Sequence, residues 1–162
     1  MIRSRRSIRQ YLDKVPEDKL IQQILEAGSW APSGLNNQPW RFVVINDKKT
    51  IGEVAKFTQY SKIIKDAPIL IAVFLDGGSS YNRDKDLMAI GACIQNMLLE
   101  VHRLNLGACW LGEILNQKEQ VEKCLKIEED AELMAVITLG YPDEQITQGC
   151  RKTLKSLILK EI

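Results

Sequence analysis

Residues 3–11 (RSRRSIRQY) concentrate side chains that suit an anionic ligand. Four arginines and two serines fall within these nine residues, whereas the formal net charge of the whole chain is only +1. Guanidinium groups donate paired hydrogen bonds to phosphate oxygens, and serine hydroxyls can donate to the acceptor sites that remain. The segment therefore favours binding of one phosphate group. A solvated basic terminus is the alternative interpretation.

A second candidate site is the loop-forming segment APSGLNNQPW, residues 31–40. Its two prolines restrict the backbone, and Ser33, Asn36 and Gln38 place donors and acceptors between them. This composition suits recognition of a flat ring that carries carbonyl oxygens and ring nitrogens. A structural loop held by Asx turns is the alternative.

Two further segments carry weaker patterns. In residues 106–113 (LGACWLGE), glycines on both sides of an extended stretch would let a ligand lie against backbone amides. The same pattern fits a tight turn that leads into a buried strand. Arg151 and Lys152 form a late basic pair that could join the same anion, or could be two surface cations. His102 is interpreted as a surface or interface residue of a helix.

The composition narrows the class of protein. Lys and Arg number 22 against 21 Asp and Glu, so a basic field for nucleic acid is not supported. No stretch approaches the roughly 20 apolar residues that span a bilayer, and no apolar region of a secretory signal follows the N-terminus. Four scattered cysteines and one histidine favour reduced thiols in a cytoplasmic protein without a metal site.

The spacing of apolar residues predicts alternating helices and strands. Helices are expected at residues 16–28, after Asp47, at 86–104 and at 118–125, and strands at residues 42–45, 67–75, 108–111 and 133–139. The continuous apolar run at 67–75 is typical of a buried central strand. Because no repeat or linker interrupts this pattern, it predicts one α/β or α+β domain with a mixed sheet.

The order of the motifs carries more information than any one of them. RRSIR, APSGLNNQPWRFVV, GACIQNMLLE, LGACWLGE and a late RK resemble, over nearly the whole chain, the nitroreductase family of FMN-dependent flavoproteins. The resemblance implies a single FMN-binding domain over residues 1–162, an α+β sandwich with a central mixed, mainly antiparallel sheet flanked by helices. It also implies an intertwined homodimer with FMN at the subunit interface. The region after Leu75 is expected to be shorter than in larger members.

The resemblance further implies which residues bind the cofactor. The N-terminal segment would grip the FMN phosphate, ribityl chain and pyrimidine edge, and the proline-bracketed loop would approach the flavin from the other subunit. Backbone amides after the third strand would face flavin N5 and O4, and the late basic pair would lie at the phosphate. The residues are Arg5, Arg6, Ser7 and Arg9 in the N-terminal segment, and Pro32, Ser33, Gly34, Asn36 and Gln38 in the loop. Leu111 and Gly112 follow the third strand, and Arg151 and Lys152 form the late basic pair. No catalytic acid or base and no metal ligand is nominated.

The implied activity is a ping-pong oxidoreductase reaction. NAD(P)H would pass a hydride to flavin N5 and leave, and a small acceptor such as a nitroaromatic or a quinone would then be reduced on the same face. A specialised flavin enzyme without NAD(P)H turnover, dehalogenase-like or flavin-consuming, stays open, as does a flavin-binding protein without rapid catalysis. An RNA-binding module is disfavoured by the near-neutral charge. The expected partners include neither nucleic acid nor a membrane.

Overall fold

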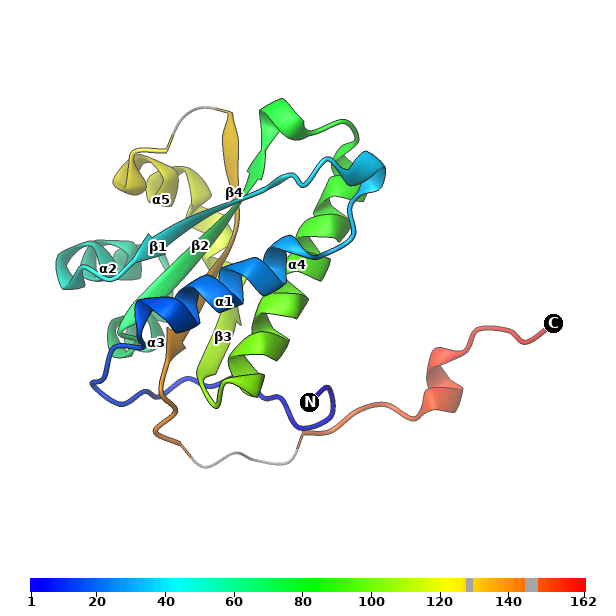
Figure 1. Ribbon diagram of the computed structural model, residues 1–162, viewed down its shortest axis with the longest axis horizontal. Helices are drawn as coiled ribbons and strands as arrows, with labels where there is room; N and C mark the ends of the chain where they lie inside the picture. The colour runs from blue at the N-terminus through cyan, green and yellow to red at the C-terminus, as the bar shows by residue number, and fades with distance from the viewer. Residues whose placement is uncertain (128–129, 145–148) are drawn as a thin grey trace.

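A four-stranded sheet forms the centre of the molecule, which the computed structural model describes at residues 1–127, 130–144 and 149–162 (Figure 1). The strands are β1 (Trp40–Ile45), β2 (Ile69–Asp76), β3 (Gly107–Leu111) and β4 (Ala131–Gly140), in the order β1-β2-β4-β3. The predicted antiparallel character is confirmed. No parallel pairing is present among the described strands, so the mixed component of the prediction is not seen there.

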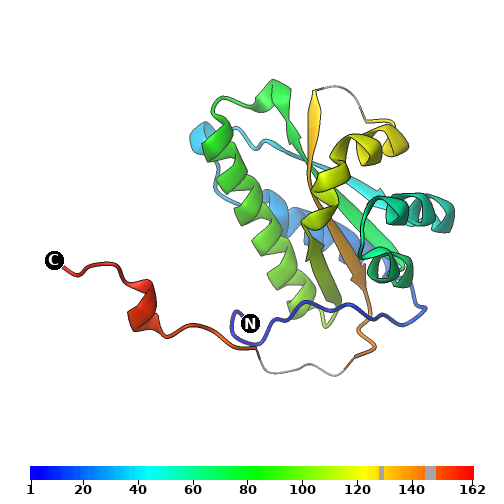
Figure 2. The ribbon, with the colours of Figure 1, turned by 180° about the vertical axis from the view of Figure 1, so that it is seen from behind.

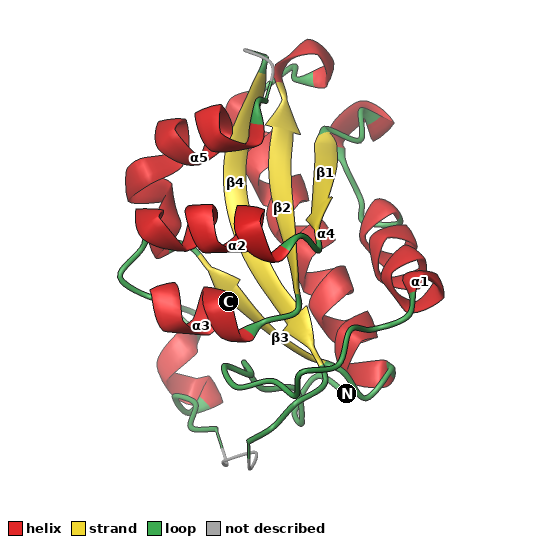
Figure 3. Ribbon diagram, turned by 90° about the vertical axis from the view of Figure 1, so that its left-hand side faces the viewer, coloured by secondary structure: helices red, strands yellow, loops and turns green. Residues whose placement is uncertain are grey.

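Helices cover both faces of this sheet (Figure 3). They are α1 (Asp18–Ser29), α2 (Lys48–Val54), α3 (Ser61–Asp66), α4 (Arg83–Arg103) and α5 (Lys118–Leu125). Helices α1 and α4 pack on one face, and α2, α3 and α5 pack on the other. Within the described residues, none of the helices combines the length and apolar character needed to cross a membrane.

Strand β2 holds the two layers together because its side chains alternate between the faces of the sheet. Ile69, Ile71 and Val73 belong to the core beneath α1 and α4. Leu70 and Phe74 belong to the core on the opposite face. The apolar run that predicted a central strand is thus explained by burial on both faces.

The predicted helices and strands are all present, and most of them have shifted boundaries. Helix α4 begins at Arg83 rather than at Asp86, because the Asn82 side chain accepts a hydrogen bond of 3.1 Å from a first-turn amide. Asp47 caps α2 in the same way at 2.8 Å, as its sequence position predicts. Only residues 77–82 connect β2 to α4, so the chain is short after Leu75. Helix α3 is too short to show a helical period in the sequence.

Tyr11 ties the N-terminal segment to the sheet. Its buried hydroxyl donates to the carbonyl oxygen of Ile8 and lies 2.7 Å from Oγ1 of Thr138 on β4. Burial raises the pKa of the Tyr11 phenol, so the hydroxyl stays protonated. The turn that follows the arginines is therefore fixed by a buried hydrogen-bond network.

Replacing Tyr11 by Phe is expected to lower the free energy of unfolding by about 1–2 kcal/mol, because it removes both hydrogen bonds of a buried hydroxyl. Urea unfolding measures this change. Tyr60→Phe is the matched control, since Tyr60 is exposed and the same atom is removed without affecting the core. Equal stability of the Tyr11→Phe and Tyr60→Phe proteins would contradict the prediction.

Glu132 links strand β4 to the starts of α4 and α5, two helices on opposite faces of the sheet. This β4 residue accepts hydrogen bonds from Arg83 at the start of α4, at 3.0 Å, and from Lys118 at the start of α5, at 2.5 Å. These bonds, with that from Arg83 as the largest contribution, lower the pKa of the Glu132 carboxyl. The ionised form therefore stabilises the fold.

This linkage predicts how stability depends on pH. The Glu132 contribution is fully present above the unfolded-state pKa of Glu, about 4.3, and is lost as pH falls through the lower folded-state value. As pH decreases from about 5 to 3, the free energy of unfolding is therefore expected to fall less steeply in Glu132→Gln than in the wild type. Urea titrations across this range test it, with Glu161→Gln in the exposed C-terminal segment as the control. Parallel curves for wild type and Glu132→Gln would refute the linkage.

Candidate functional site

The N-terminal arginine segment lies against strand β3. The Ile8 amide donates to the Ala108 carbonyl oxygen at 2.9 Å, which places the segment along this edge of the sheet. Gly107 makes the approach possible, since a Cβ atom there would lie 2.7 Å from Cγ2 of Ile8. The glycine predicted to permit close approach thus accommodates the chain's own N-terminal segment.

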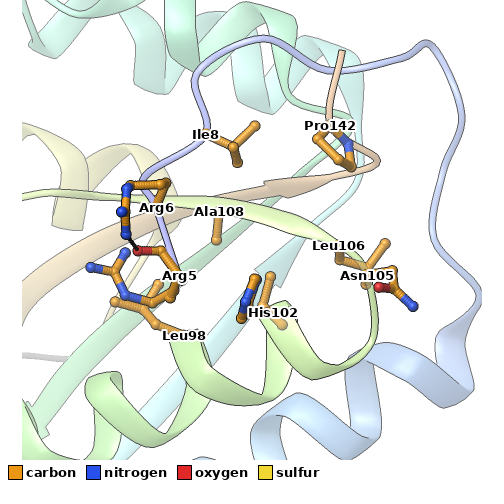
Figure 4. A pocket seen from close by; sticks show the side chains of 10 residues that line it. Arg5, Arg6, Ile8, Leu98, His102, Asn105, Leu106, Ala108 and Pro142 are labelled. Atoms are coloured by element: carbon orange, nitrogen blue, oxygen red, sulfur yellow. Dashed lines mark hydrogen bonds between the residues drawn. The ribbon is translucent and has the colours of Figure 1, made fainter. Parts of the chain in front are cut away.

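Arg5 and Arg6 line a pocket of about 180 Å³ between this segment and the C-terminal end of α4 (Figure 4). The Arg6 guanidinium donates to the carbonyl oxygens of Arg3 and Arg5, both at 2.8 Å. Leu98 and Leu106 contribute apolar walls. The pocket therefore combines two cationic side chains with apolar walls.

His102 lines the same pocket from the last turn of α4. Its Nε2 atom lies 2.8 Å from Oγ of Ser4, so the helix end and the arginine segment are joined directly. The surface or interface interpretation of His102 did not anticipate this position. The contact joins residues 98 positions apart, and no local spacing indicates it.

Ser7 and Arg9 extend the segment beyond the pocket. Ser7 lies near the thiol of Cys109, a free and buried cysteine of β3. Burial raises the pKa of this thiol, while Arg9 and Ser7 partly oppose the rise. Arg9 is exposed; its amide bonds the Glu144 carboxylate, and its guanidinium donates to the Ser7 carbonyl oxygen at 3.3 Å.

The late basic pair follows a glycine that contacts the arginine segment. A Cβ atom on Gly149 would lie 3.0 Å from Cζ of Arg6, so the chain passes directly over this guanidinium. Arg151 and Lys152 come next and are exposed. The structure thus places Gly149 beside the N-terminal arginines, and a role of Arg151 and Lys152 at the same anion stays a prediction.

Leu111 and Gly112 close strand β3. Leu111 is buried, whereas a Cβ atom on Gly112 would have no neighbour within 4 Å among the described residues. Glu113 follows and accepts a hydrogen bond from the Thr58 hydroxyl, which fixes the turn. The backbone at Gly112 is therefore held in place and open on one side.

The proline-bracketed loop has an unusual backbone. Leu35, Asn36 and Gln38 have φ values of 56°, 55° and 47°, in the left-handed region. The Ser33 hydroxyl accepts from the Gln38 amide at 3.1 Å. Gly34 lies against Tyr81, where a Cβ atom would be 1.7 Å from the tyrosine hydroxyl, so a larger residue would displace this side chain. Pro32 is exposed.

This loop and the arginine segment lie at opposite ends of α4 (Figures 1 and 2). Asn37 contacts Asp86 in the first turn of the helix, whereas Ser4 contacts His102 in the last. A helix of 21 residues is about 30 Å long. One chain therefore does not bring its Ser33, Gly34, Asn36 and Gln38 together with its Arg5, Arg6, Ser7 and Arg9.

Sequence reasoning also omitted Asn37 and Asp86, which form a partly buried hydrogen bond of 2.7 Å beneath the loop. Asp86 lay in the expected helix, and Asn37 stood unremarked between two predicted site residues. Only the folded chain shows that they meet. No group of three His, Cys, Asp or Glu side chains in the described parts is arranged to hold a metal ion.

Comparisons with known proteins identify the family. The model of the nitroreductase family matches residues 2–60 and 52–141. A candidate nitroreductase from Desulfovibrio desulfuricans, solved in complex with FMN, is 46% identical, with a TM-score of 0.95 over 99% of this chain and 94% of that one. A candidate NADH oxidase from Clostridium acetobutylicum is 30% identical, with a TM-score of 0.91 over 99% of each chain.

A curated relative agrees with these structures. A candidate NADH dehydrogenase/NAD(P)H nitroreductase of Methanothermobacter thermautotrophicus is 33% identical over 88% of this chain and 76% of its own length. The chain belongs to the nitroreductase family. The resemblance inferred from the motifs and the α+β fold class are confirmed.

Proposed function

We propose that the chain is an FMN-dependent NAD(P)H oxidoreductase. The observation that carries the proposal is the pocket at which Arg5 and Arg6 converge beside β3. It occurs in a member of the nitroreductase family that is 46% identical, over 99% of its length, to a protein solved with FMN. The curated relative's name supplies the NAD(P)H part of the activity.

The residues of the pocket fit a phosphate-bearing cofactor. Arg5 and Arg6 place guanidinium donors at the pocket from the N-terminal segment, His102 adds a ring nitrogen from α4, and none of the described lining residues is acidic. Apolar neighbours such as Leu98 and Leu106 lower the local dielectric constant, which strengthens a charge–charge contact. Arg5 and Arg6 would hold the phosphate, with Arg151 and Lys152 adding positive charge from the late segment.

The other assigned residues would orient the ring system. When bound, FMN supplies the hydride chemistry between NAD(P)H and a small acceptor such as a nitroaromatic or a quinone. Arg9, assigned to the pyrimidine edge, would favour negative charge there. Ser7 would add a hydroxyl donor, and the fixed backbone at Leu111 and Gly112 would present amides to the ring. No acid or base among the side chains is assigned.

We further propose a homodimer with FMN at the interface, each subunit acting as one FMN-binding domain over residues 1–162. Because the loop and the arginines lie about 30 Å apart along α4, one cofactor can contact both only if a second copy supplies the loop. A groove of about 360 Å³ beside Gly91 of α4, lined by Leu87 and Trp110, offers an apolar surface for that copy.

The C-terminal arm, residues 149–162, supports the same assembly. Every residue of the arm is exposed, and it extends away from the body of the molecule (Figures 1 and 2). Leu154, Leu157, Leu159 and Ile162 are apolar side chains on this arm. We infer that the arm packs against the second subunit, which would remove these side chains from water. The expected cytoplasmic location stays a prediction.

The visible absorption spectrum of the purified protein, before and after anaerobic addition of NADH and then NADPH, tests the proposed function. A flavin spectrum that bleaches with either nucleotide supports it. A flavin spectrum that stays unbleached leaves FMN binding in place and favours a specialised flavin enzyme or a flavin-binding protein. A colourless protein that fails to bind added FMN would overturn the proposal.

A further inference from the structure

Among the described residues, Asp86 is the one charged residue whose side chain is fully buried. Its carboxylate accepts four hydrogen bonds at the start of α4. Oδ2 accepts from the Ser80 hydroxyl at 2.7 Å and from the amides of Tyr81 and Asn82, both at 3.2 Å. Oδ1 accepts from Nδ2 of Asn37 at 2.7 Å. Its partners are thus neutral dipoles, and none of the ion pairs found in the described residues includes it.

The two carboxylate oxygens have separate tasks. Oδ2 binds the hydroxyl and amides that precede α4, as an acidic residue in a helical first turn commonly does. Oδ1 is directed to the loop at residues 33–38 through Asn37. Burial alone would raise the pKa of this carboxyl, but the hydrogen bonds from Ser80 and Asn37 and from the two backbone amides lower it overall, so it stays ionised.

Asn37 is the inward-facing member of the loop. Its Nδ2 group donates to Asp86 and also to the Ser79 carbonyl oxygen at 3.0 Å. Asn36 and Gln38, on either side of it, have left-handed backbones, a conformation that asparagine tolerates but glutamine seldom adopts. A strained backbone persists only where its surroundings hold it. The Asp86–Asn37 bond supplies such a restraint from beneath.

We propose that Asp86 is a positioning residue for the flavin site, acting through Asn37 to set the backbone of residues 33–38. This inference rests on the proposed function, because it takes that loop to face the FMN of the second subunit. Asp86 is buried under the loop and does not itself reach the ligand. Its negative charge aligns the Asn37 amide group, and that amide fixes the residues that carry the contacts.

Three variants separate this role from simple capping of the helix. Asp86→Asn removes the charge with little change in shape. Asn37→Asp places a second carboxylate against the first and leaves the Oδ2 contacts in place. The double variant, Asp86→Asn with Asn37→Asp, restores one amide and one carboxylate across the 2.7 Å link. If each substitution only damaged the structure, the losses of FMN affinity would add up in the double variant. If the charge–amide pair is what matters, the double variant would recover part of the FMN affinity.

The measurement is the FMN dissociation constant, from quenching of flavin fluorescence by apo-protein. Asn37→Asp is expected to weaken FMN binding by about 10²-fold and Asp86→Asn by about 10-fold, within the range of pairwise coupling energies. The double variant should bind about 10-fold more tightly than Asn37→Asp. Ile64→Ala is the control, because Ile64 is fully buried in α3 on the other face of the sheet. It should leave FMN affinity within about twofold.

Wild-type affinity in Asn37→Asp would overturn the inference, as would a double variant no better than that single variant. Equal weakening by Ile64→Ala would also overturn it, because general loss of stability would then explain the effect. A wild-type protein that binds no FMN would instead refute the proposed function, before any variant is compared.

Discussion

Replacing Arg5 by Ala is expected to weaken FMN binding about 10²-fold, which corresponds to about 2.7 kcal/mol. Arg5 lines the pocket that we assign to the phosphate, and hydrogen bonds between charged groups beside apolar walls are among the strongest in proteins. The same change should leave the fold intact, since Arg5 is only half-buried. Fluorescence titration of apo-protein with FMN gives the dissociation constant.

Arg103→Ala is the matched control for this experiment. Arg103 lies at the same end of α4 and carries the same charge, but its guanidinium is bound to Glu100 at 2.6 and 2.8 Å. It is absent from the lining of the phosphate pocket. FMN affinity should therefore change little. Similar losses in Arg5→Ala and Arg103→Ala would mean that net charge, not the pocket, governs binding.

A chain that ends at Lys152 is expected to be monomeric and to purify without FMN. The deletion removes apolar side chains that are almost wholly exposed in the single chain, including Leu159 and Ile162, at 103% and 109% relative exposure. Burying one large aliphatic side chain contributes about 1.5–3 kcal/mol, so several together could hold two subunits in place. Light scattering at micromolar concentration measures the assembly, and the absorption spectrum measures bound flavin.

The control for the truncation keeps the apolar arm and changes its charge. Lys155 and Lys160 are exposed lysines of the same segment, and replacing both by Ser should preserve the dimer and its flavin. A truncated protein that remains a flavin-loaded dimer would show that the arm is dispensable. A monomer that retains full flavin would contradict the shared site.

The elements of the fold were largely predictable because local patterns specify them. The apolar run of β2 is buried on both faces, which is the condition under which a strand loses its polar alternation. Helix α5 spans the predicted residues, and Asp47 caps α2. The apolar spacing predicts α4 only from Asp86, whereas the helix begins three residues earlier, after the Asn82 cap.

The candidate site was predictable only in pieces. The arginine segment and the proline-bracketed loop each have a recognisable composition, but composition does not reveal distance. His102 meets Ser4 across 98 positions, and Asp86 meets Asn37 across 49, so both contacts depend on the packing of α4. The placement of the loop and the arginines at opposite ends of that helix likewise required the folded chain. The sequence alone could not show that one polypeptide holds the two proposed half-sites, the loop and the arginine segment, at opposite ends of one helix.

The separation of these half-sites along α4 has a genetic consequence. If two subunits share each cofactor, a chain with damaged arginines still offers an intact loop, and a chain with a damaged loop still offers intact arginines. Two defective alleles expressed together would then complement each other, since each mixed pair rebuilds one sound centre and concentrates both defects in the other. With random pairing of equal amounts, roughly a quarter of all centres would be sound. A protein that completed its centre within one chain would show no such rescue.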